Sequence, residues 1–147
     1  MDWDLPDRLL KRLRCGESRQ VPHASPSDLG QFQAERSKCH DNVNRWCHDH
    51  SNDISIKGWL VTGTVHGAVF DKHSVINRGQ TGLLDITPLP DRAYSTFLIY
   101  EGSQEEYDSL PNQIISTEFF ELFPCAGSHG FGMYVQVHLA AINYTIA

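Results

Sequence analysis

The stretch Lys72-His-Ser-Val-Ile-Asn-Arg-Gly-Gln-Thr-Gly-Leu-Leu-Asp-Ile-Thr87 decides how we expect this chain to fold. Two short runs rich in apolar residues flank a polar loop that contains two glycines, a pattern typical of a β-hairpin. If residues 78–82 form the loop, the simplest register places Asn77 opposite Leu83. The stretch therefore predicts two antiparallel strands with a fixed register.

That register decides which side chains share a face of the hairpin. It pairs Val75 with Asp85 and His73 with Thr87, which makes Asp85 the diagonal neighbour of His73. Side chains alternate along a strand, so His73 and Asp85 project from the same face, and diagonal neighbours lie roughly 7–8 Å apart. A shift of the loop by one residue would place them on opposite faces. The sequence thus predicts an imidazole within reach of a carboxylate.

Outside this hairpin, predicted helices come first and predicted strands follow. Helices are expected at residues 4–14 and 37–50, with a polar connector at 17–27, and strands at 54–65, 68–77, 83–86 and 96–100. Residues 108–122 have helical character interrupted by Pro111, and residues 133–146 resemble one more strand. This order predicts an α+β fold, with N-terminal helices packed on a mostly antiparallel sheet of about four to six strands. A length of 147 residues fits a single domain spanning 1–147.

Composition excludes several classes of function. The net charge is −6 and the longest basic cluster is residues 11–14, which disfavours nucleic acid as a partner. No apolar stretch is long enough to span a bilayer, and the acidic N-terminus is unlike a secretory signal. The four cysteines are sparse and irregularly spaced, which favours mostly free thiols in a reducing compartment. We therefore expect a cytoplasmic protein, or one exported by a route without a classical signal peptide.

Cys39 is the candidate nucleophile. It lies near the start of the second predicted helix, where the helix dipole and a neighbouring imidazolium favour the thiolate. Cys47 lies late in the same helix, where the dipole opposes a thiolate, and Cys15 and Cys125 border segments rich in polar residues and glycine. Together with His73 and Asp85, Cys39 completes the set of groups that a thiol-dependent acyl transfer needs.

Four short motifs follow one another in the chain. They are Cys-x-x-Asn-Val at residues 39–43, Gly-Trp at 58–59, His-Ser-Val at 73–75 and Asp-Ile-Thr-Pro at 85–88. In this order they resemble small bacterial and phage-type members of the papain-like and NlpC/P60 superfamily of cysteine hydrolases, over about residues 33–100. The resemblance implies a compact papain-like domain. It makes Cys39 the nucleophile, His73 the general base and acid, and Asp85 the group that orients His73.

The resemblance also implies a site for the oxyanion and a class of substrate. Gln33, or equally Gln31, would help the backbone N–H of Cys39 to bind the oxyanion. The substrate would be a protein, a peptide or a small amide, and the reaction peptidase, amidase, deamidase or transamidase chemistry without a cofactor. The chain is much shorter than papain and lacks the Cys-Gly-Ser-Cys-Trp signature, so papain's substrate preferences do not transfer. Glycines make residues 63–67 and 125–132 the candidate cleft segments.

Two alternatives remain open. Residues 39–50 are rich in metal-binding side chains, and a structural zinc ion would be held by Cys39, His40, Cys47 and His50. Alternatively, the chain is a papain-like domain that has lost catalysis and serves in binding. Four further histidines have no assigned role in catalysis: His48, His66, His129 and His138. Asn42 is expected to be a helix-surface or helix-packing residue, and Trp46 and Trp59 are expected in the core.

Overall fold

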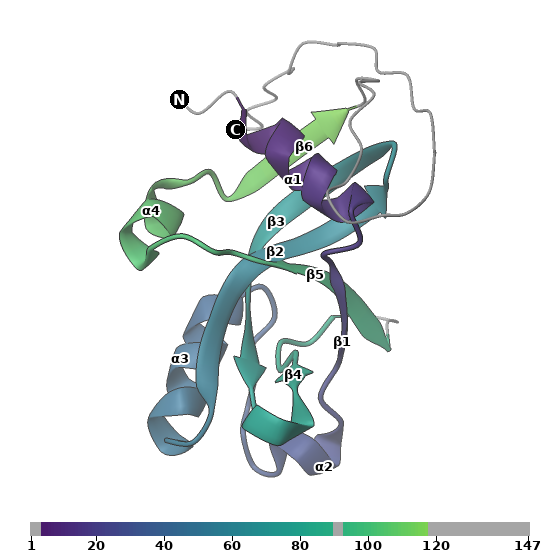
Figure 1. The fold of residues 1–147 in the computed structure, drawn as a ribbon. Helices are drawn as coiled ribbons and strands as arrows, with labels where there is room; N and C mark the ends of the chain where they lie inside the picture. The colour runs from purple at the N-terminus through teal and green to yellow at the C-terminus, as the bar shows by residue number, and fades with distance from the viewer. Residues whose placement is uncertain (1–3, 90–92, 118–147) are drawn as a thin grey trace.

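Two long antiparallel strands form the centre of the fold, which is described here by a computed structural model for residues 4–89 and 93–117. Strand β2 (Ile54–Thr64) pairs along its whole length with β3 (Gly67–Asn77) (Figure 1). Both strands are rich in β-branched and aromatic residues, which suit a pleated, half-buried surface. This hairpin provides the surface on which the other elements pack.

In the described ranges, six strands form one sheet with antiparallel pairing. Its order is β1-β5-β2-β3-β4, and β6 pairs separately with β3. The four strands added to the central hairpin are β1 (Arg19–Pro22), β4 (Leu83–Leu84), β5 (Tyr94–Ile99) and β6 (Gln113–Thr117). The α+β fold predicted from the sequence is confirmed.

One edge of β3 is shared between two partners. Strand β6 pairs with residues 67–71, and β4 pairs with Ile76 and Asn77. Within the described residues, no strand pairs with residues 72–75 on that side. The N-terminus of helix α3 (Cys39–Asp49) lies against this gap, where the Sγ of Cys39 is 3.9 Å from the carbonyl oxygen of Lys72.

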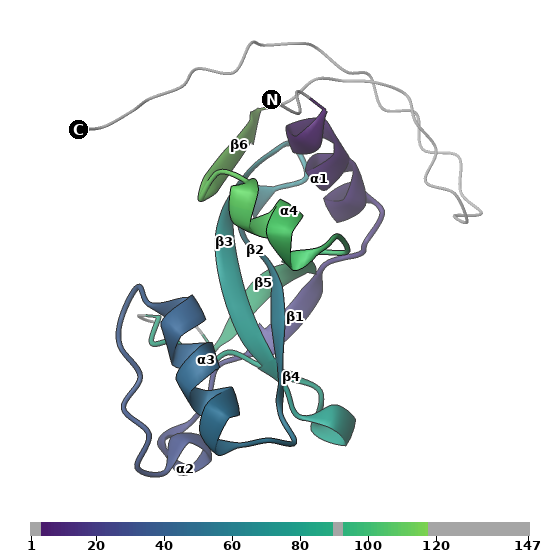
Figure 2. The same cartoon turned by 90° about the vertical axis from the view of Figure 1, so that its left-hand side faces the viewer.

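Helices cover one face of the central hairpin. Helix α1 (Leu5–Arg14) lies near the turn between β2 and β3, and α3 lies near the opposite end (Figure 1). The short α4 (Gln104–Ser109) is placed between them (Figure 2). Strand alternation places Trp59 and Ile76, which contact these helices, on the same face. Helix α2 (Pro26–Leu29) belongs to the segment that leads to α3.

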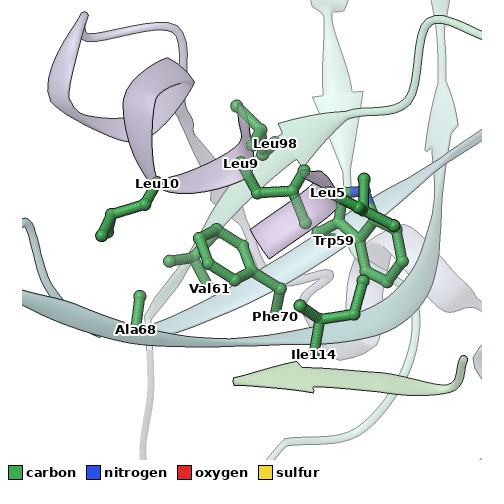
Figure 3. Close-up of a cluster of buried hydrophobic side chains, with 9 residues drawn as sticks. All are labelled: Leu5, Leu9, Leu10, Trp59, Val61, Ala68, Phe70, Leu98 and Ile114. Atoms are coloured by element: carbon green, nitrogen blue, oxygen red, sulfur yellow. The ribbon is translucent and has the colours of Figure 1, made fainter. Parts of the chain in front are cut away.

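The buried side chains form a cluster under each long helix. Under α1, leucines of its apolar stripe pack on β2, β3, β5 and β6 (Figure 3); the cluster contains Leu5, Leu9, Leu10, Trp59, Val61, Ala68, Phe70, Leu98 and Ile114. Under α3, the buried residues are Val43, Trp46, Ile76, Leu84 and Ile86. Trp46 and Trp59 therefore lie in the core, as expected. A third cluster, Val21, Val75 and Phe97, packs near the strand that carries His73.

The structure departs from the sequence-based expectations in two segments. The predicted connector 17–27 contains β1 and the start of α2. Strand β1 forms there because Val21 is buried and pairs with Ser95 of β5. The helical character expected from residue 108 onward does not continue through residues 110–117: α4 ends at Ser109 and β6 begins at Gln113. Pro111 cannot continue a helix, and the chain after it pairs with the open edge of β3. The strand predicted at 133–146 lies outside the described residues.

Within residues 4–89 and 93–117, no helix combines the length and the apolar character that crossing a bilayer requires.

Candidate active site

The thiol of Cys39 lies at the first residue of α3. The first N–H groups of a helix have no partner inside the helix and carry a partial positive charge, so they favour an anion at this position. The chain enters the helix through Ser37, whose φ of 58° is in the left-handed region, and through Lys38 as the N-cap. This sharp entry places Cys39 against β3.

Asn42 fixes the loop that precedes the thiol. Its amide donates to the carbonyl oxygen of Glu35 at 2.8 Å, and its Oδ1 accepts from the N–H of Glu35 at 2.9 Å. The same amide reaches Thr87 Oγ1 at 3.3 Å. Asn42 is fully buried. Its side chain therefore does more than pack in the helix: it holds the loop before α3 and joins α3 to the segment after β4.

His73 and Asp85 form a buried hydrogen-bonded pair. Nε2 of His73 lies 2.8 Å from Oδ2 of Asp85, and both side chains are shielded from solvent. The pairing of Asn77 with Leu83 has the predicted register, which explains why the two side chains meet. The bond to Nε2 leaves Nδ1 without the carboxylate, and interaction with Cys39 helps to raise the pKa of His73.

Further groups hold Asp85. Its Oδ1 accepts from the N–H of Thr87 at 3.0 Å, and its Oδ2 accepts from Ser95 Oγ at 3.3 Å. Ser95 Oγ is in turn 2.7 Å from Nε2 of His23. Sequence reasoning missed Ser95 and His23, because their approach depends on where β1 and β5 pair. The residues on both sides of His23 hydrogen-bond the backbone of Asp85. The N–H of Ala24 donates to the carbonyl oxygen of Asp85 at 2.8 Å, and the N–H of Asp85 donates to the carbonyl oxygen of Pro22 at 2.9 Å.

The charges of the site favour a thiolate and an imidazolium. Burial alone would raise the pKa of Cys39, but hydrogen bonds and charge interactions with His40 and His73 lower it from 9.0 to about 6. Burial alone would lower the pKa of His73, but its interactions with Asp85 and Cys39 raise it from 6.5 to about 9. Between about pH 6 and 9, Cys39 and His73 therefore form an ion pair.

A second imidazole lies beside the sulfur. Nδ1 of His40 is 2.6 Å from the hydroxyl of Ser74, which is fully buried, and interaction with His40 helps to lower the pKa of Cys39. The ring of Tyr107 packs edge-on against His40, with centroids 6.1 Å apart. The sequence offered His40 as a zinc ligand, whereas the structure places it next to the candidate nucleophile.

Tyr107 ties α4 to the strand of the site. Its hydroxyl lies 2.7 Å from the carbonyl oxygen of Gly58 and accepts from the N–H of His73 at 3.1 Å. Burial raises the pKa of Tyr107, so the hydroxyl stays protonated. Tyr107 was not singled out in the sequence, because α4 was not predicted there.

The glutamines proposed for the oxyanion lie elsewhere. Gln31 and Gln33 are exposed and line an open depression of about 900 Å³ together with Trp46 and His50. That depression follows the later part of α3, whereas Cys39 lies at the start of the helix. The structure therefore does not bring Gln33 to the sulfur. Among the described residues, the backbone N–H groups at the start of α3 lie at the thiol and are able to hold an anion there.

The alternative zinc ligands are not brought together. Cys39 and Cys47 are separated by about 12 Å along the helix axis. His50 stacks on Trp46 with ring centroids 3.9 Å apart, and its Nδ1 faces the carbonyl oxygen of Trp46. Among residues 4–89 and 93–117, no three or more Cys, His, Asp or Glu side chains are grouped so that they could hold a metal ion.

The remaining sequence expectations concern scattered residues. Cys39 and Cys47 are free thiols as expected, but Cys15 is disulfide-bonded.

The candidate cleft at 63–67 is the turn of the hairpin far from Cys39, where the carbonyl oxygen of Val65 accepts a hydrogen bond from Arg14 of α1. This segment therefore does not border the thiol. His48 and His66 are exposed. His129, His138 and the segment 125–132 lie outside the described residues.

Comparisons with known proteins found no relative of this chain. No protein-family model matches the chain, no curated protein matches it, and no solved structure matches it. The assignment of function therefore rests on the arrangement of the described side chains.

Proposed function

We propose that this protein catalyses acyl transfer at an amide bond through Cys39, His73 and Asp85. The observation that carries the proposal is a thiol at a helix N-terminus whose pKa is lowered by a histidine that is held 2.8 Å from a buried carboxylate. An imidazole fixed by a carboxylate next to a nucleophile is the common feature of triad enzymes. The order of these residues in the chain also supports kinship with papain-like proteins.

The proposed first half-reaction forms a thioester. The Cys39 thiolate attacks the carbonyl carbon, an S–C bond forms, and the carbonyl electrons move to oxygen. The N–H groups at the start of α3 stabilise that oxyanion. When the C–N bond breaks, the amine leaves with the proton from Nδ1 of His73.

In the second half-reaction, water releases the acyl group. His73, now neutral, accepts a proton from water as the oxygen attacks the thioester carbon. The S–C bond breaks, and a carboxylic acid and the Cys39 thiolate are produced. Another amine in place of water would give transamidation by the same steps. Peptides, proteins and small amides are the proposed substrates.

The test is to trap the thioester or its stable equivalent. Wild-type protein and Cys39→Ala are incubated with a panel of peptides that carry a vinyl sulfone or an activated ester, and intact mass is measured. We expect one adduct per wild-type chain, mapped to Cys39 by peptide digestion, and none on Cys39→Ala. Cys47 is an internal control, because burial and the charge of Asp53 raise the pKa of its thiol.

Equal labelling of Cys39 and Cys47 would contradict catalysis. It would favour the inactive binding domain, which needs the fold but no activated thiol. The zinc alternative has no support in the described residues, where Cys39 and His40 lie at the start of α3, and Cys47 and His50 lie at its end.

A further inference from the structure

Cys39 is approached by imidazoles from two directions. His73 and Ser74 are neighbours on β3, so their side chains point to opposite faces of the sheet. His73 lies on the face of Asp85. Ser74 lies on the other face, where its hydroxyl is 2.6 Å from Nδ1 of His40. The sulfur lies at the edge of β3, 3.9 Å from the carbonyl oxygen of Lys72, and interactions with both rings lower the pKa of its thiol.

Ser74 sets which nitrogen of His40 can face the sulfur. Its side chain is fully buried, and a buried hydroxyl requires a hydrogen-bond partner. If the hydroxyl donates to Nδ1, the proton of a neutral imidazole is on Nε2. That N–H is then a donor with a fixed direction.

We propose that His40 is a second donor to the nucleophile, in which Ser74 fixes the ring and Nε2–H hydrogen-bonds the sulfur of Cys39. This inference rests on the proposed function and extends it. It assigns a catalytic role to a residue that the triad does not include.

The second donor acts on the sulfur as a leaving group. Release of the acyl group requires the S–C bond to break with both electrons on Cys39. His73 has by then taken a proton from the attacking water, and a hydrogen bond from His40 adds to the stabilisation of the thiolate and loses no proton in the step. In the first half-reaction the thiolate is the nucleophile, and the same hydrogen bond lowers its reactivity. His40 therefore supports the second half-reaction more than the first.

Other groups near the sulfur do not replace this donor. The carbonyl oxygen of Lys72 can only accept a hydrogen bond, and the Lys72 ammonium is placed over the ring of Tyr107, 5.0 Å from its centroid. The Tyr107 hydroxyl is engaged with the backbone of Gly58 and His73. Asp85 reaches Cys39 only through His73.

The experiment measures the pH dependence of Cys39 alkylation by iodoacetamide, followed by peptide mass mapping with Cys47 as the internal reference. Variants are His40→Ala, His40→Gln, Ser74→Ala and His73→Ala. The matched control is His48→Ala, an exposed histidine on the same helix. Circular dichroism and thermal melting check that each variant is folded.

We expect the alkylation midpoint of His40→Ala to rise by at least about one pH unit, a tenfold change in the ionisation equilibrium. His40→Gln keeps an N–H donor and should recover part of that change, and Ser74→Ala should cause a smaller rise. His73→Ala should keep a midpoint below that of Cys47, and adding His40→Ala should remove the difference. With an activated ester, His40→Ala should accumulate more acyl-enzyme than wild type.

Two outcomes contradict the inference in different ways. A low wild-type midpoint that is unchanged in His40→Ala and His40→Gln overturns the role of His40 and leaves the proposed function intact. A wild-type Cys39 that titrates together with Cys47 overturns the proposed function and this inference with it. Should His40→Ala fail to fold, His40→Gln and Ser74→Ala carry the test.

Discussion

The side-chain amide of Asn42 lies 3.3 Å from the hydroxyl of Thr87, which joins the helix that carries the thiol to the segment that carries the carboxylate. Thr87 also donates its backbone N–H to Asp85. The helix of the proposed nucleophile and the proposed orienting carboxylate are therefore connected through Asn42 and Thr87, without passing through His73. Such a connection holds the site in place before substrate arrives.

The first prediction concerns this connection. Asn42→Ala removes the two hydrogen bonds to Glu35 and the contact with Thr87, and it leaves a cavity beneath α3. We expect a loss of about 1–3 kcal/mol in the free energy of unfolding, measured by urea denaturation. The matched control is Asn44→Ala, an exposed amide on the same helix, which should change stability by less than about 0.5 kcal/mol. Equal effects of the two substitutions would show that the clamp contributes nothing.

The second prediction concerns ionisation. Because the pKa of Cys39 is lowered to about 6 and that of His73 is raised to about 9, thiolate absorbance at 240 nm should rise near pH 6. That rise should be missing in Cys39→Ser, and the His73 ring should titrate near pH 9 by NMR. Below the lower value the thiol is protonated, and above the higher value the general acid is lost. Turnover should therefore peak between them; a thiol that ionises near pH 9 would contradict the ion pair.

The third prediction concerns the carboxylate. Asp85→Asn keeps the shape of the side chain but removes the charge that helps to raise the pKa of His73. We expect kcat/KM to fall by about 10²–10⁴-fold and the pKa of His73 to fall. Ser95→Ala removes only one hydrogen bond to Asp85 and keeps the carboxylate, so it should lower kcat/KM much less than Asp85→Asn does. An Asp85→Asn variant with wild-type turnover would exclude Asp85 from the mechanism.

The fourth prediction concerns Gly58, which is paired with His73. A Cβ at this position would overlap the carbonyl oxygen of Leu98 and lie 2.7 Å from the ring of Phe97. Because the backbone of β5 cannot move aside without breaking its strand pairing, Gly58→Ala should destabilise the fold by about 3 kcal/mol. Gly79→Ala is the control: a Cβ there meets nothing within 4 Å, and its φ of +65° should cost only about 1–2 kcal/mol. Thermal melting measures the stability of both variants. A smaller loss of stability for Gly58→Ala than for Gly79→Ala would contradict the packing argument.

The hairpin could be predicted from sequence because the information is local. A glycine-containing loop between two short runs fixes the pairing of Asn77 with Leu83, and alternation then places His73 and Asp85 on one face. The helix that begins at Cys39 was predicted for the same reason, from the spacing of Val43 and Trp46. These two local predictions are enough to propose the thiol, the imidazole and the carboxylate.

The surroundings of the triad depend on long-range pairing and could not be read from the sequence. Ser95 reaches Asp85 because β5 and β1 lie together, although the paired residues Val21 and Ser95 are far apart in the sequence. Gln33 lies close to Cys39 in sequence, yet the loop carries it to the other part of α3. His40 offers no sign of a partner in the sequence, since Ser74 meets it only after α3 packs on β3.

The interrupted edge of β3 has a consequence for aggregation. Unpaired backbone at a sheet edge is a template for association with another chain. Here the start of α3 covers the stretch between β6 and β4, so the element that presents the thiol also blocks edge-to-edge assembly. Mutations that loosen this helix would therefore expose unpaired strand backbone as well as displace the proposed nucleophile, so a single substitution there could promote aggregation and remove the proposed activity together.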